Sequence, residues 1–480
     1  MRGELHRLMI LLILAVLLLP LPAWAFKVEL HGDFNNRYEF NNKSNMFYGE
    51  NIITGSKANY INSERVNAED LVKDGKDRMD DDTTFWGEAK YRMWIGASDD
   101  EEKVKGVWAM EVGSLKYGDT HKGSVGKSTG GGYSGDGVNI ETRWLYLDFQ
   151  NPFVKQKNRF RLGLQPVGLN YFVWNETAMG IKMYGNLSDK VDYQLAWFRP
   201  QDDSVATDEE NDDGGFVKVG LKFLNGWKAT LYSLYLRKGG DETYFNPTKQ
   251  KNGHFDDDRW YLGAELKGKE GPWKLWLNAI YLTGSVDSDI KDFFNGESHL
   301  SRKGYLLHAD LSYKLAENLK LALTGMYASG DDNGSDGNLD NFSSVDVDVS
   351  GKYSVIYFEA LTDDNYLSDA PYFWDKGLQN YRLKLDYTTK LLNRKLKLAT
   401  AVGYLGTAED VEWYDWDKDK HEDSYIGTEV DGYLSYELYK GLSFNIMTGY
   451  LFSGDVMNMY SEDNDADDLC RFTFNVRYKF

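Results

Sequence analysis

The chain contains a single cysteine, Cys470, so it can form neither an intrachain disulfide nor a C-x-x-C-H haem attachment site. Only 8 of its 480 residues are proline, and beyond residue 25 it has no apolar run of about 18 residues that could form a transmembrane helix. Basic residues are outnumbered, with 55 Lys and Arg against 75 Asp and Glu, which gives a net charge of −20. That balance argues against nucleic acid as a partner, because binding nucleic acid needs a basic patch. We also expect no bound cofactor.

The first 25 residues have the pattern of a secretory signal peptide. Arg2 and Arg7 supply a charged start, and the apolar run from residue 8 to 19 is too short for a helix that needs roughly 20 residues to cross a bilayer. Ala23-Trp24-Ala25 then forms a small-residue cleavage pattern. We therefore expect the mature chain to begin at Phe26.

Aromatic residues and glycine are abundant, with 33 Tyr, 24 Phe, 14 Trp and 47 Gly, while the mean hydropathy of −0.55 is polar. A disordered acidic chain would lack the aromatics. A transmembrane barrel with a wet lumen needs apolar side chains only at alternate positions, so its average hydropathy resembles that of a soluble protein.

Segments with this alternation recur along the whole chain and predict eighteen strands. They cover residues 28–40, 85–97, 104–114, 138–149, 158–165, 178–187, 190–199, 215–225, 227–237, 259–268, 272–283, 302–315, 318–329, 378–389, 394–406, 425–438, 442–453 and 469–480. The last segment is the clearest, since Phe472, Phe474, Val476, Tyr478 and Phe480 alternate with polar residues. It resembles the closing strand of bacterial outer-membrane β-barrels, in which a C-terminal Phe serves as an assembly signal, and this resemblance implies that role for Phe480.

Connectors between the segments alternate between short ones, such as 225–226, and long acidic ones, such as 202–213. Outer-membrane barrels are built from short periplasmic turns and long extracellular loops. We therefore predict an all-β fold, a transmembrane antiparallel β-barrel of about 18 strands, with 16 as an alternative. Residues 26–480 would form this single domain.

Apolar and polar side chains also alternate over residues 350–362, so this segment could be a further strand. Long connectors flank it on both sides, and single-chain bacterial barrels have even strand numbers. We interpret about 330–377 as one long loop that could fold into the lumen. The alternative is that 350–362 is a true strand and a weaker segment is not.

The inferred inward phase brings charges of both signs into the lumen. The predicted pore-lining residues are Lys90, Arg92, Glu141, Arg143, Arg159, Arg161, Gln165, Arg382, Lys384, Arg471 and Arg477. One interpretation is that these charges pair with acidic neighbours such as Glu111 and keep the wall wet. The other is a basic strip opposite an acidic one that selects anionic solutes.

Two sequence stretches resemble the paired motif of alginate-export-type and related substrate-specific porins. They are TRWLYLDF at 142–149 and NRFRLGLQPVGLNYF at 158–172, with Arg143, Arg161, Gly163 and Gln165 at the matching positions. Leu164 stands where that family commonly has Arg, which weakens the transfer of a polyanion-exporting role.

Two further chemistries come into question. The acidic loop at 331–337 is similar to a calcium loop but lacks the Glu expected at its twelfth position, so we interpret it as a solvated surface and expect no metal site. Weak binding of divalent cations that bridge lipopolysaccharide phosphates is the functional alternative.

A hydrolase would need Ser and an oriented His together. His308 shares a face with Asp310 and Ser312, but no motif surrounds it, so we expect no enzyme.

The sequence as a whole indicates an outer-membrane porin of a Gram-negative cell that passes small hydrophilic solutes by diffusion. A substrate-specific channel for anions or sugars, of the alginate-export type, is one alternative. A scaffold barrel that sheathes a partner, such as a multihaem electron carrier, is another. Expected partners are outer-membrane lipid and lipopolysaccharide, the barrel assembly machinery, the solutes, and further copies of the chain in a homotrimer.

Overall fold

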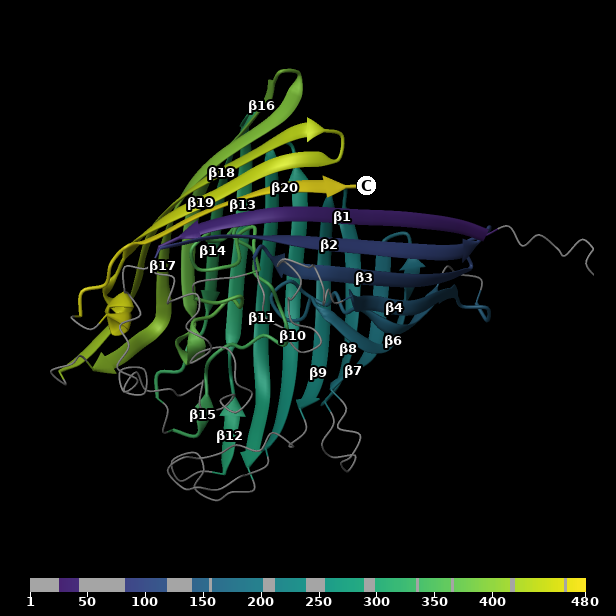
Figure 1. Cartoon of the computed structure of the whole chain (residues 1–480). Coiled ribbons are helices and arrows are strands. Elements are labelled where there is room, and N and C mark those ends of the chain that lie inside the picture. Colours follow the sequence, from purple (N-terminus) through teal and green to yellow (C-terminus); the bar gives the residue numbers. More distant parts are fainter. Residues whose placement is uncertain are drawn as a thin grey trace, which may run out of the picture.

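The computed structural model describes residues 26–42, 83–118, 140–154, 158–201, 212–238, 255–288, 298–333, 336–363, 367–414, 419–461 and 464–480; the predicted signal peptide lies outside them. Eighteen antiparallel strands form one closed barrel (Figure 1). They are β1 (Phe26–Asn41), β2 (Thr84–Asp99), β3 (Val104–Lys116), β4 (Ile140–Gln150), β5 (Arg159–Pro166), β6 (Thr177–Ser188), β7 (Val191–Gln201), β8 (Asp212–Leu224), β9 (Trp227–Lys238), β10 (Phe255–Glu270), β11 (Trp273–Ser288), β13 (Tyr305–Ala316), β14 (Leu319–Ala328), β16 (Leu378–Leu391), β17 (Arg394–Tyr414), β18 (Lys420–Tyr439), β19 (Leu442–Ser453) and β20 (Leu469–Lys479).

The first and last strands close the barrel. β1 lies beside β20 (Figure 1), with Asp33 opposite Lys479 at one end of the ladder and Asn41 opposite Arg471 at the other. Closure leaves no unpaired sheet edge in the hydrocarbon, where each unsatisfied backbone group would cost several kcal/mol. The predicted barrel of 18 strands is confirmed, and each strand overlaps its predicted segment.

Short elements accompany the barrel. β12 (His299–Arg302) and β15 (Asn338–Leu339) pair in parallel with each other, while β11 pairs directly with β13 and β14 with β16. The 3-10 helices η2 (Trp374–Lys376) and η3 (Asp455–Tyr460) lie in connectors. Among the residues that the structure describes, no helix is long and apolar enough to cross a membrane.

One strand departs from the predicted side-chain phase. Strict alternation along β4 around the predicted inward Arg143 would place Trp144 and Tyr146 on the lipid face. Instead Leu145 and Leu147 are the exposed apolar side chains, and the guanidinium of Arg161, which pairs with the inward Asp148, lies over the Tyr146 ring. A bulge between β3 and β4 shifts the register at this point, so that Arg143 also reaches the inner face.

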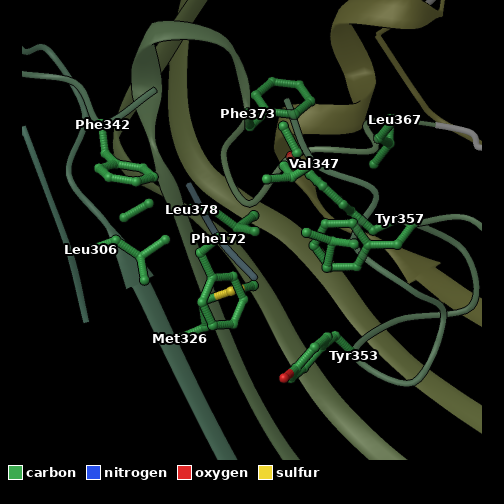
Figure 2. Packing of buried hydrophobic residues seen from close by; sticks show 14 of the residues in the cluster. Phe172, Leu306, Met326, Phe342, Val347, Tyr353, Tyr357, Leu367, Phe373 and Leu378 are labelled. Carbon is green, nitrogen blue, oxygen red and sulfur yellow. The ribbon is translucent and has the colours of Figure 1, made fainter. Parts of the chain in front are cut away.

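Two connectors fold into the lumen. We name the described residues between β14 and β16, 329–333, 336–363 and 367–377, the inward loop, and residues 167–176, between β5 and β6, the inward connector. Figure 2 shows Phe172 of the connector and Phe342 of the loop close to the wall residues Leu306 and Met326, with Tyr357 of the loop farther away in the same cluster. All five side chains are at most 1% exposed, so this part of the lumen is a dry core. Residues 350–362 contribute no barrel strand.

Candidate functional site

The inward loop is tied to the barrel wall by buried charged groups. Asp363 accepts hydrogen bonds from both terminal nitrogens of Arg37 on β1, at 2.7 Å each, and from the Lys90 ammonium on β2, at 2.7 Å. On β18, three strands from β1 across the seam, Glu429 accepts bonds from the Ser354 hydroxyl and from the Val355 amide, the latter at 2.7 Å. The loop is therefore fixed to wall strands on both sides of the seam between β1 and β20.

The inward connector meets the loop in the middle of the lumen. The amide of Val345 donates to the carbonyl of Val173 at 2.7 Å, and the Ser344 hydroxyl donates to the carbonyl of Phe172 at 2.8 Å. Two wall lysines hold the start of the connector: Lys182 donates to the carbonyls of residues 166 and 167, and Lys218 to those of 168 and 169, at 2.6–3.0 Å. The loop and connector together narrow the channel.

Three of the predicted pore-lining residues gather around one carboxylate. Glu111 on β3 lies 2.8 Å from Lys90, 2.5 Å from Arg92 and 3.3 Å from Arg143, measured between charged atoms. Arg92 and Arg143 keep 38% and 27% of their side chains exposed, so they remain accessible from the lumen. Three cations therefore surround Glu111, and two of them also have a second acidic neighbour, Asp363 for Lys90 and Glu176 for Arg143.

Arg159 and Arg161 repeat the arrangement nearer the periplasmic turns. Both guanidinium groups bind Asp148 on β4, at 2.5 and 2.8 Å, and Tyr184 donates to the same carboxylate. We name Lys90, Arg92, Arg143, Arg159 and Arg161 the basic strip. These charges are paired with acids, as the first interpretation predicts, whereas selection of anionic solutes stays a prediction.

Three other predicted residues face inward but are sealed from water. Gln165, Arg382 and Arg471 are at most 3% exposed. Gln165 donates to the carbonyl of Gly180 at 2.9 Å, Arg382 to that of Tyr353 at 2.9 Å, and Arg471 to that of Phe358 at 3.0 Å. Their expected role in lining the pore is replaced by a role in supporting the wall and the inward loop.

The remaining predicted residues have separate surroundings. Glu141 is exposed on β4, and Arg477 binds Asp33 across the seam of the barrel at 2.5 Å. The ammonium of Lys384 lies 3.7 Å from the centre of the Tyr433 ring. The structure therefore does not gather all the predicted residues into one site.

An acidic patch on the inward segments faces the basic strip. It comprises Glu176, Asp346, Asp348, Glu359 and Asp369, and the Glu176 carboxylate lies 3.9 Å from Arg143. Burial and the charges of Asp348 and Asp369 raise the pKa of Asp346 to about 6. Burial, together with Asp348 and Asp363, raises the pKa of Glu359 to about 9. Among the described residues no group of His, Cys, Asp and Glu is arranged to hold a metal ion.

A second basic surface was not singled out from the sequence. Twelve lysines alternate with lipid-facing residues at the periplasmic ends of β8–β17; we name them the lysine arc: Lys218, Lys222, Lys228, Lys267, Lys269, Lys274, Lys314, Lys320, Lys384, Lys390, Lys395 and Lys397. Within the described part of the chain, the same inner faces of these ends carry only three carboxylates, Glu265, Asp310 and Asp386. The signal was present in the sequence, because ten of these lysines occupy inward positions of predicted strands, and Lys269 and Lys390 directly follow two of those strands.

The register places lysines of the arc directly opposite one another. Lys228 lies across from both Lys222 and Lys267, and Lys269 lies across from Lys274. The same holds for Lys314 with Lys320 and for Lys390 with Lys395. Like charges at directly opposite positions destabilise a strand pair by a few tenths of a kcal/mol up to about 1 kcal/mol.

Comparison with known proteins agrees with the barrel. The family model described as alginate export matches residues 175–346. The structure is similar to that of OpdK from Pseudomonas aeruginosa, with a TM-score of 0.50 and 11% identity over 94% of this chain and 99% of that one. The chain has the fold of an outer-membrane porin.

Two other solved porins give lower TM-scores. OccK9 (OpdG) of Pseudomonas aeruginosa gives a TM-score of 0.49 and 11% identity over 95% of this chain and 98% of that one. The trimer form of OmpT from Vibrio cholerae gives 0.43 and 12%, covering 95% and 100%. No curated protein matches the chain in sequence.

The barrel belongs in the outer membrane, as predicted, and forms a channel for small solutes. The matched region 175–346 lies beyond the motif that suggested the family.

Proposed function

We propose that this outer-membrane channel for small solutes prefers anions, and that the lysine arc is the surface that gives it this preference. The main support for this proposal is that lysines of the arc lie directly opposite one another on the inner wall. The lysines of each such pair repel one another, and carboxylates offset this only in part, since Lys228, Lys267 and Lys320 form ion pairs with Asp192, Glu265 and Asp386. A solute anion between two lysines would relieve that repulsion.

The size of the solutes follows from the inward segments. The loop and connector fill part of the lumen with a dry core, and we propose that solutes pass between the basic strip and the acidic patch. There Arg143 and Glu176 approach to 3.9 Å with 27% and 29% of their side chains exposed. Such a charged gap favours small, hydrated polar solutes over extended polymers.

Reversal potentials in planar bilayers under a potassium chloride gradient test the proposal. The triple variant Lys222→Glu, Lys267→Glu, Lys395→Glu should lower the anion-to-cation permeability ratio at least several-fold, since each reversed charge changes the local energy of a passing ion by about 2 kcal/mol at ~4 Å in water. The matched control is Lys303→Glu, in the extracellular connector beside Asn338, which should leave the ratio unchanged. A cation-preferring wild-type channel would refute the proposal.

A catalytic role is not part of the proposal. His308 is 3% exposed and binds Asn278 at 3.1 Å and the Tyr353 hydroxyl at 3.3 Å. These contacts join the wall to the inward loop and use both ring nitrogens. The sheath alternative is disfavoured too, because the chain's own loop and connector take up space in which a partner protein would lie.

Partners beyond the solutes are proposals of the same kind. Homotrimer formation, contact with lipopolysaccharide and recognition of Phe480 by the assembly machinery are consistent with a barrel whose outer face is apolar. Crosslinking of the barrel in intact outer membranes would report its copy number, and a single-copy product alone would argue against the trimer.

A further inference from the structure

The ammonium group of Lys352, in the inward loop, is surrounded by three aromatic rings. Its Nζ lies 4.3 Å from the ring centre of Tyr353, 5.0 Å from that of Trp276 and 5.7 Å from that of Tyr171. The rings come from the loop, from β11 and from the inward connector. Cations within about 6 Å of an aromatic face are attracted by the ring quadrupole.

A carboxylate completes the surroundings of Lys352. Asp310 on β13 lies 3.8 Å from the Lys352 ammonium. The carboxylate is fixed by a hydrogen bond from Thr324 at 2.6 Å and by His308 at 3.3 Å. Three aromatic faces and one anion form the kind of enclosure that recognises ammonium groups. We name Tyr171, Trp276, Tyr353 and Asp310 the cage.

Lys352 occupies the cage without being sealed into it. Its side chain remains 45% exposed, so solutes in the lumen can reach the cage from the same side. Burial lowers the pKa of Lys352, and Lys267 and Lys320 lower it further, while Asp310 acts in the opposite direction. The enclosure therefore fits a cation, but the one that it holds is repelled by neighbouring lysines and can be exchanged.

We propose that the cage is a binding subsite for the ammonium group of a small zwitterionic solute, and that Lys352 is its tethered occupant when solute is absent. The carboxylate of such a solute would meet Lys267 and Lys320 of the lysine arc, whose charges act on Lys352. This assignment of the carboxylate rests on the proposed anion preference. The ammonium subsite rests only on the cage.

Two probes of equal shape separate charge from size. Glycine betaine carries a trimethylammonium head on an acetate group, and 3,3-dimethylbutanoate replaces the charged nitrogen with carbon. Binding is measured by titration calorimetry on the folded, detergent-solubilised barrel, with folding checked by heat-modifiable gel migration. In the variant Lys352→Ala, betaine should bind about tenfold more tightly than in the wild type, because the tethered competitor is gone. Affinity for 3,3-dimethylbutanoate should change by less than about twofold, because a neutral head gains nothing from the ring quadrupoles.

Matched variants locate the effect. Lys303→Ala, a lysine removed outside the lumen, should bind both probes as the wild type does. Adding Trp276→Leu to Lys352→Ala should cancel the gain for betaine, whereas adding Tyr353→Phe, which keeps the ring, should preserve it. Equal gains for the two probes, no gain for betaine, or a gain that survives Trp276→Leu would each overturn the proposal.

The outcome can be told apart from a failure of the proposed anion preference. The lysine-arc variants could leave the permeability ratio unchanged while Lys352→Ala still gains affinity for betaine and not for its carbon isostere. That result would support the cage as an ammonium subsite and refute the role of the lysine arc in anion preference. If the permeability ratio responds and betaine does not, the cage assignment alone is wrong.

Discussion

Arg471 on the last strand and Glu39 on the first form a fully buried ion pair across the seam of the barrel, with Nη2 and Oε2 2.8 Å apart and both side chains 0% exposed. Thr362 of the inward loop donates to the same carboxylate, and Arg471 donates to the carbonyls of Val355 and Phe358 at 3.2 and 3.0 Å. One pair therefore joins the closure of the barrel to the position of the loop that narrows it.

Replacing Arg471 with Met should destabilise the barrel and release the loop together. The change leaves the Glu39 carboxylate buried without its counter-charge, which typically costs about 3–5 kcal/mol. We expect a fall of that order in the free energy of unfolding, measured by urea titration in lipid vesicles. Single-channel conductance should rise because the loop loses two of its anchors.

A second variant shows whether the cost arises from the unpaired charge. Adding Glu39→Gln to Arg471→Met removes the buried carboxylate, so the double variant should be more stable than Arg471→Met alone. A double variant as unstable as the sum of the two single ones would mean that the residues act independently, contrary to their geometry.

Selectivity should depend on pH through the acidic patch. The raised pKa of Asp346, about 6, means that this carboxyl gains its charge between about pH 5 and 7. The anion-to-cation permeability ratio should therefore fall over that interval, and in Asp346→Asn the step should disappear. A step of the same size in the variant would assign the titration to another group.

The same shifts have a consequence for the inward loop. For Asp346 and Glu359 the folded pKa lies above the unfolded value of about 4, so the neutral form favours the folded loop. That contribution is complete below about pH 4 and is lost as pH rises through about 6 for Asp346 and about 9 for Glu359. Hydrogen exchange of the loop amides should accordingly quicken as pH rises from about 5 to about 9, after correction for the intrinsic rate, and level off above that, and Glu359→Gln should suppress the change.

The lysine arc predicts that stability and selectivity change in opposite directions. Lys395 lies directly opposite Lys390, so Lys395→Glu turns a repelling pair into an attracting one and should stabilise the barrel by about 0.2–1 kcal/mol. The same variant should lower the anion preference. Lys395→Gln, which only removes the charge, should give a smaller effect of the same sign in both measurements. A Glu variant that loses stability would contradict the paired register.

Much of the architecture could be predicted from the sequence because a lipid-facing strand must alternate. That constraint is local, so segments such as 227–237 and 442–453 revealed their strands and their phase. The β4 bulge at Arg143 was missed because a single extra residue changes the phase without leaving a composition signal. The folding of residues 167–176 into the lumen depends on contacts with a loop far away in the chain, such as Ser344 with Phe172, which no local pattern encodes.

The candidate site was predictable only in part for a related reason. Inward phase identified Lys90, Arg92 and Arg143, but phase does not say whether an inward side chain meets water or a folded-in loop. Arg471 and Arg382 also face inward and are buried because the inward loop covers them. The lysine arc becomes apparent as a surface only once strand register shows that its members stand opposite one another.

Phe480 packs beside Gly32 of the first strand, and this contact allows two explanations of the terminal aromatic to be separated. The two residues exchange backbone hydrogen bonds of 3.1 Å, and a Cβ on Gly32 would lie 2.3 Å from the Phe480 ring. Deleting Phe480 removes both the bonds and the residue that the resemblance assigns as an assembly signal, so we expect loss of insertion, measured as the heat-modifiable fraction in outer membranes. Gly32→Val displaces the ring but keeps the terminal Phe, and should insert with reduced stability. If Gly32→Val fails to insert as completely as the deletion does, Phe480 acts through packing at the seam, and the assignment as an assembly signal is wrong.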